Sequence, residues 1–225
     1  MTEKWRATKT PMIEHLLTYD RALFAWINSA GSSTWDPFWL IVTDKWSSLP
    51  LYLLLLLLLR RYYNWRQVLE TLLVVALMIL VTDQLANLFK YILVQRPRPC
   101  QEAALQDQLR MVAAYCGRYG YFSAHAASAA ALASFFIRWI KHNITAAPES
   151  DSGQSAARFN KLVLRIIPAL LLVWAFSLGY SRIYLGVHYP LDVLTGWFVG
   201  TALGGFVFYP VQQGIINRSV KFQKQ

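Results

Sequence analysis

Charged side chains are scarce in this sequence: Asp, Glu, Lys and Arg make up 15% of the 225 residues, whereas 56% are hydrophobic. Soluble domains carry about 25% charged residues, so this composition indicates a membrane protein. The sequence also lacks a basic patch with interleaved aromatic residues, which argues against a nucleic-acid partner despite the net charge of +10. The lysines and arginines instead fall between apolar runs, as membrane topology requires.

Metal ligands and processing signals are lacking as well. Four histidines and no clustered carboxylates give no convincing metal-ligand set, so we expect neither a metal nor another cofactor. The first apolar run begins after Met12 and is interrupted by charges, so we expect no cleavable signal peptide. Nothing in the sequence indicates an obligatory protein partner.

Apolar segments predict an all-α fold: a polytopic membrane helical bundle with five transmembrane helices. We expect one domain over residues 1–225, with the bundle at 34–215 and a basic tail at 216–225. The expected spans are 37–59, 68–93, 123–140, 162–180 and 190–215. Asp44 and Lys45 lie inside the first span, where we expect them to form an ion pair.

The N-terminal segment, residues 1–33, predicts an amphipathic helix that lies in the membrane interface. One face of residues 12–27 carries Ile13, Leu16, Leu17, Phe24 and Ile27, and the other face carries Glu14, Thr18, Arg21 and Asn28. This segment is too polar to span a membrane, so an interfacial position is expected, with packing against the bundle as the alternative.

Residues 181–192 read S-R-I-Y-L-G-V-H-Y-P-L-D and place four polar groups in hydrophobic surroundings. Asp192 lies four residues after His188, and Pro190 suits the first turn of a helix, so the carboxylate can reach the imidazole. A carboxylate on one ring nitrogen leaves the other as a nucleophile. Arg182 and Ser181 add phosphate-binding groups. The stretch therefore predicts phosphoryl transfer to histidine.

Two upstream segments carry further phosphate-compatible groups: Y-F-S-A-H at 121–125 and K-Y-I-L-V-Q-R-P-R-P at 90–99. With these three segments the chain resembles the type 2 phosphatidic acid phosphatase family, whose motifs run K-x6-R-P, P-S-G-H and S-R-x5-H-x3-D. The third motif is matched at every fixed position. In the second, Phe122 replaces Pro and Ala124 replaces Gly. In the first, seven residues separate Lys90 from Arg98, and Arg96 is a rival with five.

The resemblance implies a role for each matched residue. His188 is expected to attack phosphorus, Asp192 to orient it, and His125 to protonate the leaving oxygen. The expected phosphate-binding residues are Lys90, Arg98, Ser123, Ala124, Ser181 and Arg182. Ser123 also predicts the N-cap of the third span, where backbone N–H groups favour an anion.

The resemblance further implies a metal-independent lipid phosphatase whose partners are its lipid phosphate substrate and the membrane lipids. Residues 60–66, 138–165 and the tail carry eleven lysines and arginines, whereas the loops on the other side carry six. The positive-inside rule then directs the motifs outward, to the periplasmic side of a bacterial-type inner membrane.

The lack of a large polar insertion that could hold a sugar or glycerol headgroup favours undecaprenyl pyrophosphate as the substrate. The alternatives are phosphatidylglycerol phosphate, phosphatidic acid and lipid A. A phosphotransferase that uses the same histidine and a non-catalytic lipid-binding protein are further alternatives.

Cys100 and Cys116 are the two cysteines of the chain, and both fall in the outward loop. In an oxidising compartment a disulfide between them would close about 17 residues and brace the segment between the first two motifs. Two free thiols are the alternative.

Overall fold

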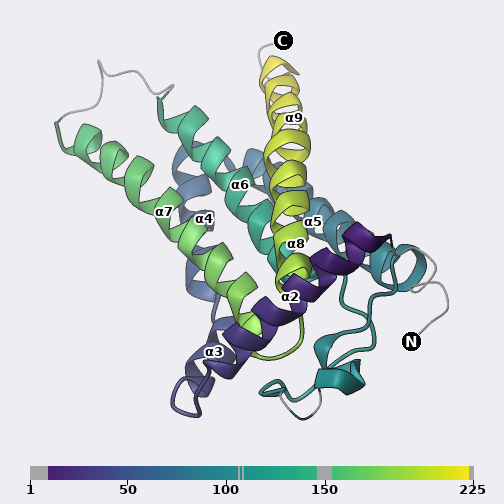
Figure 1. The fold of residues 1–225 in the computed structure, drawn as a ribbon. Helices are drawn as coiled ribbons and strands as arrows, with labels where there is room; N and C mark the ends of the chain where they lie inside the picture. Colours follow the sequence, from purple (N-terminus) through teal and green to yellow (C-terminus); the bar gives the residue numbers. More distant parts are fainter. Residues whose placement is uncertain (1–9, 106, 108, 146–153, 223–225) are drawn as a thin grey trace.

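The computed structural model describes residues 10–105, 107, 109–145 and 154–222, which form helices and no named strand (Figure 1). The helices in chain order are α2 (Pro11–Ser29), α3 (Asp36–Thr43), α4 (Leu49–Tyr62), α5 (Trp65–Leu88), η1 (Phe89–Leu93), η2 (Pro99–Gln101), η3 (Ala103–Leu105), α6 (Ala124–Thr145), α7 (Gln154–Tyr184), α8 (Pro190–Ala202), η5 (Leu203–Phe208) and α9 (Tyr209–Phe222). The all-α prediction is confirmed.

Three helical stretches in the described part of the chain are long and apolar enough to cross a membrane. They are Trp65–Leu93, Ala157–Tyr184 and Pro190–Ser219, and they correspond to the second, fourth and fifth expected spans. α6, the third expected span, packs against α7 and α8 and also contacts α5. Twelve of its residues are buried, so α6 forms the centre of the bundle.

Small residues let α6 and α8 approach closely. Gly196, Gly200 and Gly204 recur every four residues and lie along one stripe of α8 and η5. A Cβ at Gly200 would lie 2.0 Å from the Ala127 carbonyl oxygen, and one at Gly196 would lie 2.7 Å from that of Ser123. This backbone-to-backbone contact is typical of membrane helices with small residues at their interface. It fixes α8 against the first turns of α6.

The first expected span, 37–59, is not one helix. α3 ends at Thr43 and α4 begins at Leu49, because Asp44 takes an extended conformation and its carboxylate accepts a hydrogen bond from the Trp46 amide at 2.7 Å. Pro50 lies in the first turn of α4, where its missing N–H is harmless.

The expected ion pair between Asp44 and Lys45 is also wrong. These two described residues form no salt bridge; the Lys45 ammonium instead lies over the Trp46 ring, 5.2 Å from its centroid. The break at residues 44–48 therefore leaves polar groups at the edge of the bundle.

α2 lies obliquely across the end of the bundle at which α8 begins (Figure 1). Its buried stripe consists of Leu17, Asp20, Phe24 and Asn28. The expected assignment of Asn28 to the polar face is wrong, because Asn28 is buried on the same stripe as Leu17 and Phe24. Its amide donates to the carbonyl oxygens of Arg110 and Tyr184, both at 3.0 Å. A second, exposed apolar stripe consists of Met12, Leu16, Tyr19, Leu23 and Trp26. A helix with an outward apolar stripe suits the membrane interface.

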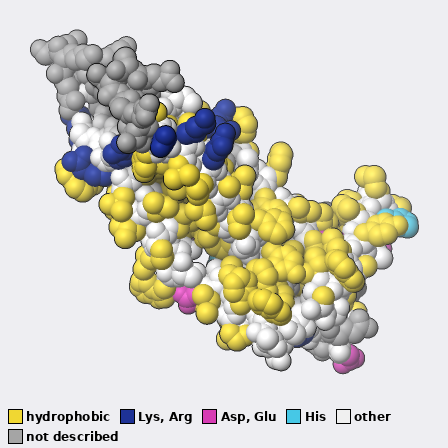
Figure 2. All heavy atoms as spheres, turned by 90° about the vertical axis from the view of Figure 1, so that its left-hand side faces the viewer, with side chains coloured by type: hydrophobic (Ala, Val, Ile, Leu, Met, Phe, Trp, Pro, Cys, Tyr) yellow, Lys and Arg dark blue, Asp and Glu magenta, His cyan; other side chains and the backbone are white. Residues whose placement is uncertain are grey.

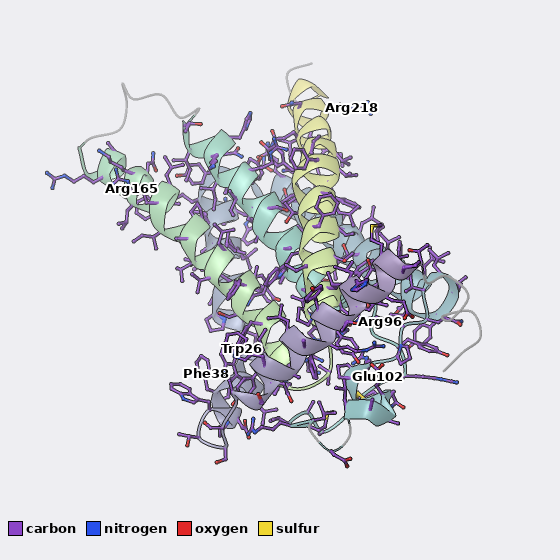
Figure 3. The ribbon with its side chains drawn as sticks, viewed as in Figure 1. Trp26, Phe38, Arg96, Glu102, Arg165 and Arg218 are labelled. Carbon is purple, nitrogen blue, oxygen red and sulfur yellow. A yellow bond between two sulfur atoms is a disulfide. The ribbon has the colours of Figure 1, made fainter. Side chains whose placement is uncertain are left out.

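Basic side chains gather at the opposite end of the bundle. Figure 2 shows Lys and Arg near that end, above a broad hydrophobic band. The exposed basic residues on the helix ends there include Arg60, Arg61, Arg66, Lys141, Arg158, Lys161, Arg165 and Arg218. Figure 3 shows Arg165 and Arg218 at this end and Arg96 and Glu102 at the other.

Candidate active site

His188 and Asp192 meet where α8 begins. Tyr189 is the N-cap of α8 and Pro190 its first residue, so Asp192 lies in the first turn. One carboxylate oxygen, Oδ2, lies 3.3 Å from His188 Nδ1 and accepts from the Tyr189 amide at 3.1 Å. Both side chains are buried. Because Asp192 occupies Nδ1, the Nε2 atom of His188 is the ring nitrogen that can keep a lone pair.

The second and third motifs are joined through the backbone. The Ser123 amide donates to the Asp192 carbonyl oxygen at 2.9 Å. Ser123 immediately precedes α6, and its Oγ accepts from the Ala126 amide at 3.5 Å, as expected of an N-cap. His125 follows in the first turn of α6 and is exposed. The N-terminal ends of α6 and α8 thus converge at His188, where their positive dipole ends favour an anion.

Arg98 and Arg96 occupy different environments. The Arg98 Nε donates to the Tyr119 carbonyl oxygen at 2.9 Å, and its side chain is half-buried. Arg96 is fully buried and forms ion pairs with Asp20 at 2.5 Å and Asp192 at 3.0 Å. The Arg96 guanidinium is therefore paired with two carboxylates. The charge of Arg98 instead lies near His188.

The loop 94–123 brings these arginines to the site. Arg96 and Gly120 are joined by a backbone hydrogen bond of 2.9 Å, and Arg98 and Arg118 by one of 3.2 Å. Gly120 permits the close approach, because a Cβ there would lie 2.9 Å from Asp192 Oδ2. The structure also joins Cys100 and Cys116 in a disulfide, which closes this loop.

Lys90 and Arg182 supply two further cations. Lys90 is buried in the π-helix η1 at the end of α5. The Arg182 Nη1 donates to Thr43 Oγ1 at 2.6 Å, while its Nε is buried without a partner in the described part of the chain. The Ser181 hydroxyl, which we expect to bind phosphate, donates to the Leu178 carbonyl oxygen at 2.7 Å.

Asp83 and Asn87 of α5, which precede Lys90 by seven and three residues, form a hydrogen bond with each other. The Asn87 amide donates to the Asp83 carboxylate at 3.1 Å.

Burial lowers the pKa of His188 well below its usual value, and the positive charges around it, Arg98 first, lower it further. The imidazole is therefore neutral near pH 7 and keeps a lone pair on one ring nitrogen. Burial acts against the charge of Arg96 too, but Asp192 and Asp20 outweigh it and raise the pKa of Arg96 above its usual value.

A cavity of about 350 Å³ opens beside His125. Its polar lining comes from Thr43 to Ser48 at the break between α3 and α4, from Asp83 of α5, and from His125 and Ser128 of α6. Apolar side chains of α4, α5, α6 and α7 line the rest. Among the described residues, no group of three or more His, Cys, Asp or Glu side chains could hold a metal ion.

The sequence profile of the PAP2 superfamily matches residues 67–215. This chain belongs to the PAP2 superfamily. The match includes the three motifs that converge at His188. As a PAP2 member with apolar spanning helices, the chain is an integral membrane protein and a lipid phosphatase.

Two relatives extend this PAP2 assignment over most of the chain. The "Lipid A 4'-phosphatase" of Bacteroides thetaiotaomicron is 33% identical over 92% of this chain and 83% of its own length. The "Lipid A 4'-phosphatase" of Porphyromonas gingivalis is 27% identical over 87% of this chain and 74% of its own length. The "Undecaprenyl-diphosphatase" of Sulfolobus acidocaldarius is 49% identical, but over 17% of this chain and 16% of its own.

A solved PAP2 structure shows the same fold. The PAP2 type phosphatidylglycerolphosphate phosphatase of Bacillus subtilis superposes with a TM-score of 0.61 and covers 95% of this chain and 90% of its own, at 18% identity.

The π-helix η1 explains the departure from the PAP2 spacing in the first motif. The Val94 amide bonds to the Phe89 carbonyl oxygen, five residues back, at 2.9 Å. A π-turn holds one residue more than an α-turn. The additional residue between Lys90 and Arg98 is therefore taken up inside the helix, and both side chains still reach the site.

Sequence reasoning missed three residues of this PAP2 site: Asp20, Thr43 and Gly120. Asp20 carries the clearest signal, because it stands between Leu17 and Phe24 at a spacing that places it on their buried stripe. Thr43 lies at a helix end that was expected to continue, so nothing in the sequence directed it toward Arg182.

Proposed function

We propose that this PAP2 phosphatase removes a phosphate monoester from a lipid A-type glycolipid through a phosphohistidine intermediate. The observation that carries the proposal is the alignment with the Bacteroides thetaiotaomicron protein over most of both chains. The short undecaprenyl-diphosphatase match gives much less support to undecaprenyl pyrophosphate, which the sequence analysis favoured. The comparisons thus favour one of its alternatives, lipid A.

The cavity beside His125 supports a sugar-containing substrate. The sequence analysis preferred a polyprenyl diphosphate because no polar insertion was evident. That reason fails, because the break between α3 and α4 places Asp44, Lys45 and Ser48 on the cavity wall. A glucosamine headgroup offers hydroxyl and amide groups to such a wall, whereas a polyprenyl chain offers none.

The proposed chemistry has two steps. His188 Nε2 attacks phosphorus and the bond from phosphorus to the sugar oxygen breaks. His125, whose cationic form the negative charge of the bound phosphate favours, gives that oxygen its proton. A water then attacks the phosphohistidine, His125 takes a proton from it, and the P–N bond breaks to release phosphate. Lys90, Arg98 and Arg182 stabilise the charge on the non-bridging oxygens in both transition states.

The site is proposed to face the periplasm. The basic residues at the far end of the bundle would then lie in the cytoplasm. Lipid A, undecaprenyl pyrophosphate and other lipid phosphates can present their phosphates at the outer leaflet, where α2 is proposed to lie. No step of the proposed chemistry requires a metal ion.

The test is phosphate release by purified protein in detergent from lipid A, undecaprenyl pyrophosphate, phosphatidylglycerol phosphate and phosphatidic acid. We expect lipid A to have the highest kcat/KM and mass spectrometry to show loss of the ester phosphate at the 4' position.

His188→Ala and His125→Ala should each nearly abolish release in folded protein. A tenfold preference for another lipid would contradict the substrate, and an active His188→Ala variant would contradict the nucleophile. A phosphorylated product formed on adding acceptor alcohols would indicate a phosphotransferase.

A further inference from the structure

Asp20 is a buried carboxylate on a helix that otherwise lies at the surface of the bundle. Its Oδ2 accepts from Arg96 Nη2 at 2.5 Å, and its Oδ1 accepts from the Leu191 amide at 2.8 Å. Leu191 is in the first turn of α8, directly before Asp192. α2 is thereby attached, through one side chain, to the backbone that carries the proposed catalytic carboxylate.

Arg96 bridges Asp20 to Asp192. Its Nη1 donates to Asp192 Oδ1 at 3.0 Å, and its guanidinium lies over the Tyr189 ring, 3.9 Å from the centroid. The side chains of Asp20, Arg96 and Asp192 are each 4% exposed or less. The planar fork of an arginine fixes two carboxylates at once, in a way that a lysine cannot. Figure 3 shows Arg96 beneath α2.

We propose that Asp20 is a positioning residue for the nucleophile, an inference that rests on the proposed phosphohistidine chemistry. Asp20 holds Arg96, Arg96 holds Asp192 Oδ1, and Asp192 Oδ2 is thereby directed at His188 Nδ1. When His188 Nε2 bonds to phosphorus and Nδ1 keeps its proton, the ring becomes cationic. Two carboxylates facing one guanidinium leave one net negative charge beside that cation, and Asp20 supplies it.

Attachment of α2 alone does not explain Asp20. α2 has other contacts with the rest of the chain, including the Arg21–Glu102 ion pair at 2.6 Å and the hydrogen bonds of Asn28. Burial of a carboxylate is costly even when it is paired, so packing between Leu17 and Phe24 would favour an apolar residue. The presence of a carboxylate at this buried position therefore agrees with an electrostatic role at the active site.

The test compares Asp20→Asn with the wild-type protein on the lipid phosphate that it hydrolyses best. We expect kcat to fall at least about tenfold, because small misplacements of a reacting group can cost up to about a hundredfold. KM should stay within about threefold, because Asp20 does not touch the substrate, and the inhibition constant for vanadate should rise in parallel with the loss of kcat. Asp20→Glu, which keeps the charge, should recover part of kcat.

Asp36→Asn is the matched control. Asp36 pairs with Arg110 at 2.6 Å, so this variant removes one carboxylate from an ion pair of similar length that does not contact His188 or Asp192. We expect its kcat to stay within about threefold of wild type. Trp fluorescence melting and size-exclusion chromatography give the folded fraction by which every kcat is divided.

Three results would overturn the role of Asp20: wild-type kcat in Asp20→Asn, a corrected loss no larger than that of Asp36→Asn, or a rise in KM that accounts for the whole effect. If Asp20→Asn does not fold, Asp20→Glu carries the test, with reduced kcat and unchanged KM expected and wild-type kcat contradicting it. The proposed function fails separately, when wild-type protein releases no phosphate or when His188→Ala remains active.

Discussion

Arg96 and Arg98 stand two residues apart and present the same chemical group to different partners. Arg96 is enclosed by Asp20, Asp192 and the ring of Tyr189. Arg98 lies half-buried against the loop near Gly120. One guanidinium therefore holds the protein's own carboxylates, and the other is suited to hold an oxygen of the substrate.

Alanine substitutions should separate the two arginines. Arg96→Ala leaves two buried carboxylates unpaired, so we expect a loss of roughly 3–5 kcal/mol in stability. Arg98→Ala removes a half-buried cation that has one hydrogen bond, so its melting temperature in detergent should remain close to wild type while kcat/KM falls at least about a hundredfold. Thermal melting followed by Trp fluorescence and steady-state kinetics measure the two effects. Stable, inactive Arg96→Ala beside unstable Arg98→Ala would reverse the assignment.

At the residue scale the sequence predicted one contact around His188 and missed another. The spacing from His188 to Asp192 predicts their contact, because both residues lie within one turn of the start of α8. The partner of Arg96 could not be predicted, since Asp20 is 76 positions away and only the packing of α2 brings the two side chains together.

Among the elements, α6 and α8 carry the strictest packing requirement. Gly200→Ala would force a Cβ to within 2.0 Å of the Ala127 carbonyl oxygen, so the two backbones must move apart. We expect a loss of about 1–3 kcal/mol in stability and a marked fall in kcat, because this contact sets the position of His188 relative to His125.

Gly214→Ala is the control for this substitution. A Cβ at Gly214 meets nothing within 4 Å, and Ala favours a helix more than Gly by about 1 kcal/mol. Its stability should equal or exceed that of the wild type, with unchanged turnover. Equal effects of the two substitutions would mean that helix propensity, and not the contact of α6 with α8, decides the result.

The disulfide between Cys100 and Cys116 braces the loop that carries Arg98. Closure of about 17 residues should contribute roughly 3 kcal/mol by the loop-entropy estimate, so Cys100→Ser/Cys116→Ser should melt at a lower temperature than the wild type. Thiol labelling of unfolded protein before and after reduction checks the bond. Complete labelling without reductant would show two free cysteines.

Among the elements, long apolar segments were predictable and the interruption of one was not. The runs at 68–93, 162–180 and 190–215 correspond to the three stretches suited to span a membrane. The run at 37–59 is also mostly apolar, but Asp44 offers its carboxylate to the Trp46 amide and so competes with helical hydrogen bonds. The mean composition of a segment does not reveal a single hydrogen bond such as this one between Asp44 and Trp46.

At the scale of the whole molecule, charge separates the two ends of the bundle. At the active-site end Arg96 and Arg110 form ion pairs, and Arg98 and Arg182 lie around His188. The exposed basic residues on the helix ends opposite include Arg60, Arg61, Lys141 and Arg165. The positive-inside rule then predicts a cytoplasmic C-terminus and a periplasmic site.

Reporter fusions test this orientation. A cytoplasmic reporter such as green fluorescent protein should be active at the C-terminus, and a periplasmic reporter such as alkaline phosphatase should be active when inserted after Met111 in the outward loop. The opposite pattern would place the active site in the cytoplasm and would exclude substrates confined to the outer leaflet.

The π-helix η1 affects how relatives of this protein can be detected. A pattern that demands a fixed number of residues between the lysine and the arginine of the first motif rejects this chain, although both side chains place their charge near His188. An insertion in a membrane helix can be geometrically silent when a wider turn accommodates it. Searches for similar enzymes should therefore allow a variable gap at this point, and removal of one residue between Tyr91 and Val94 should convert the wide turn into an ordinary α-turn with the site intact.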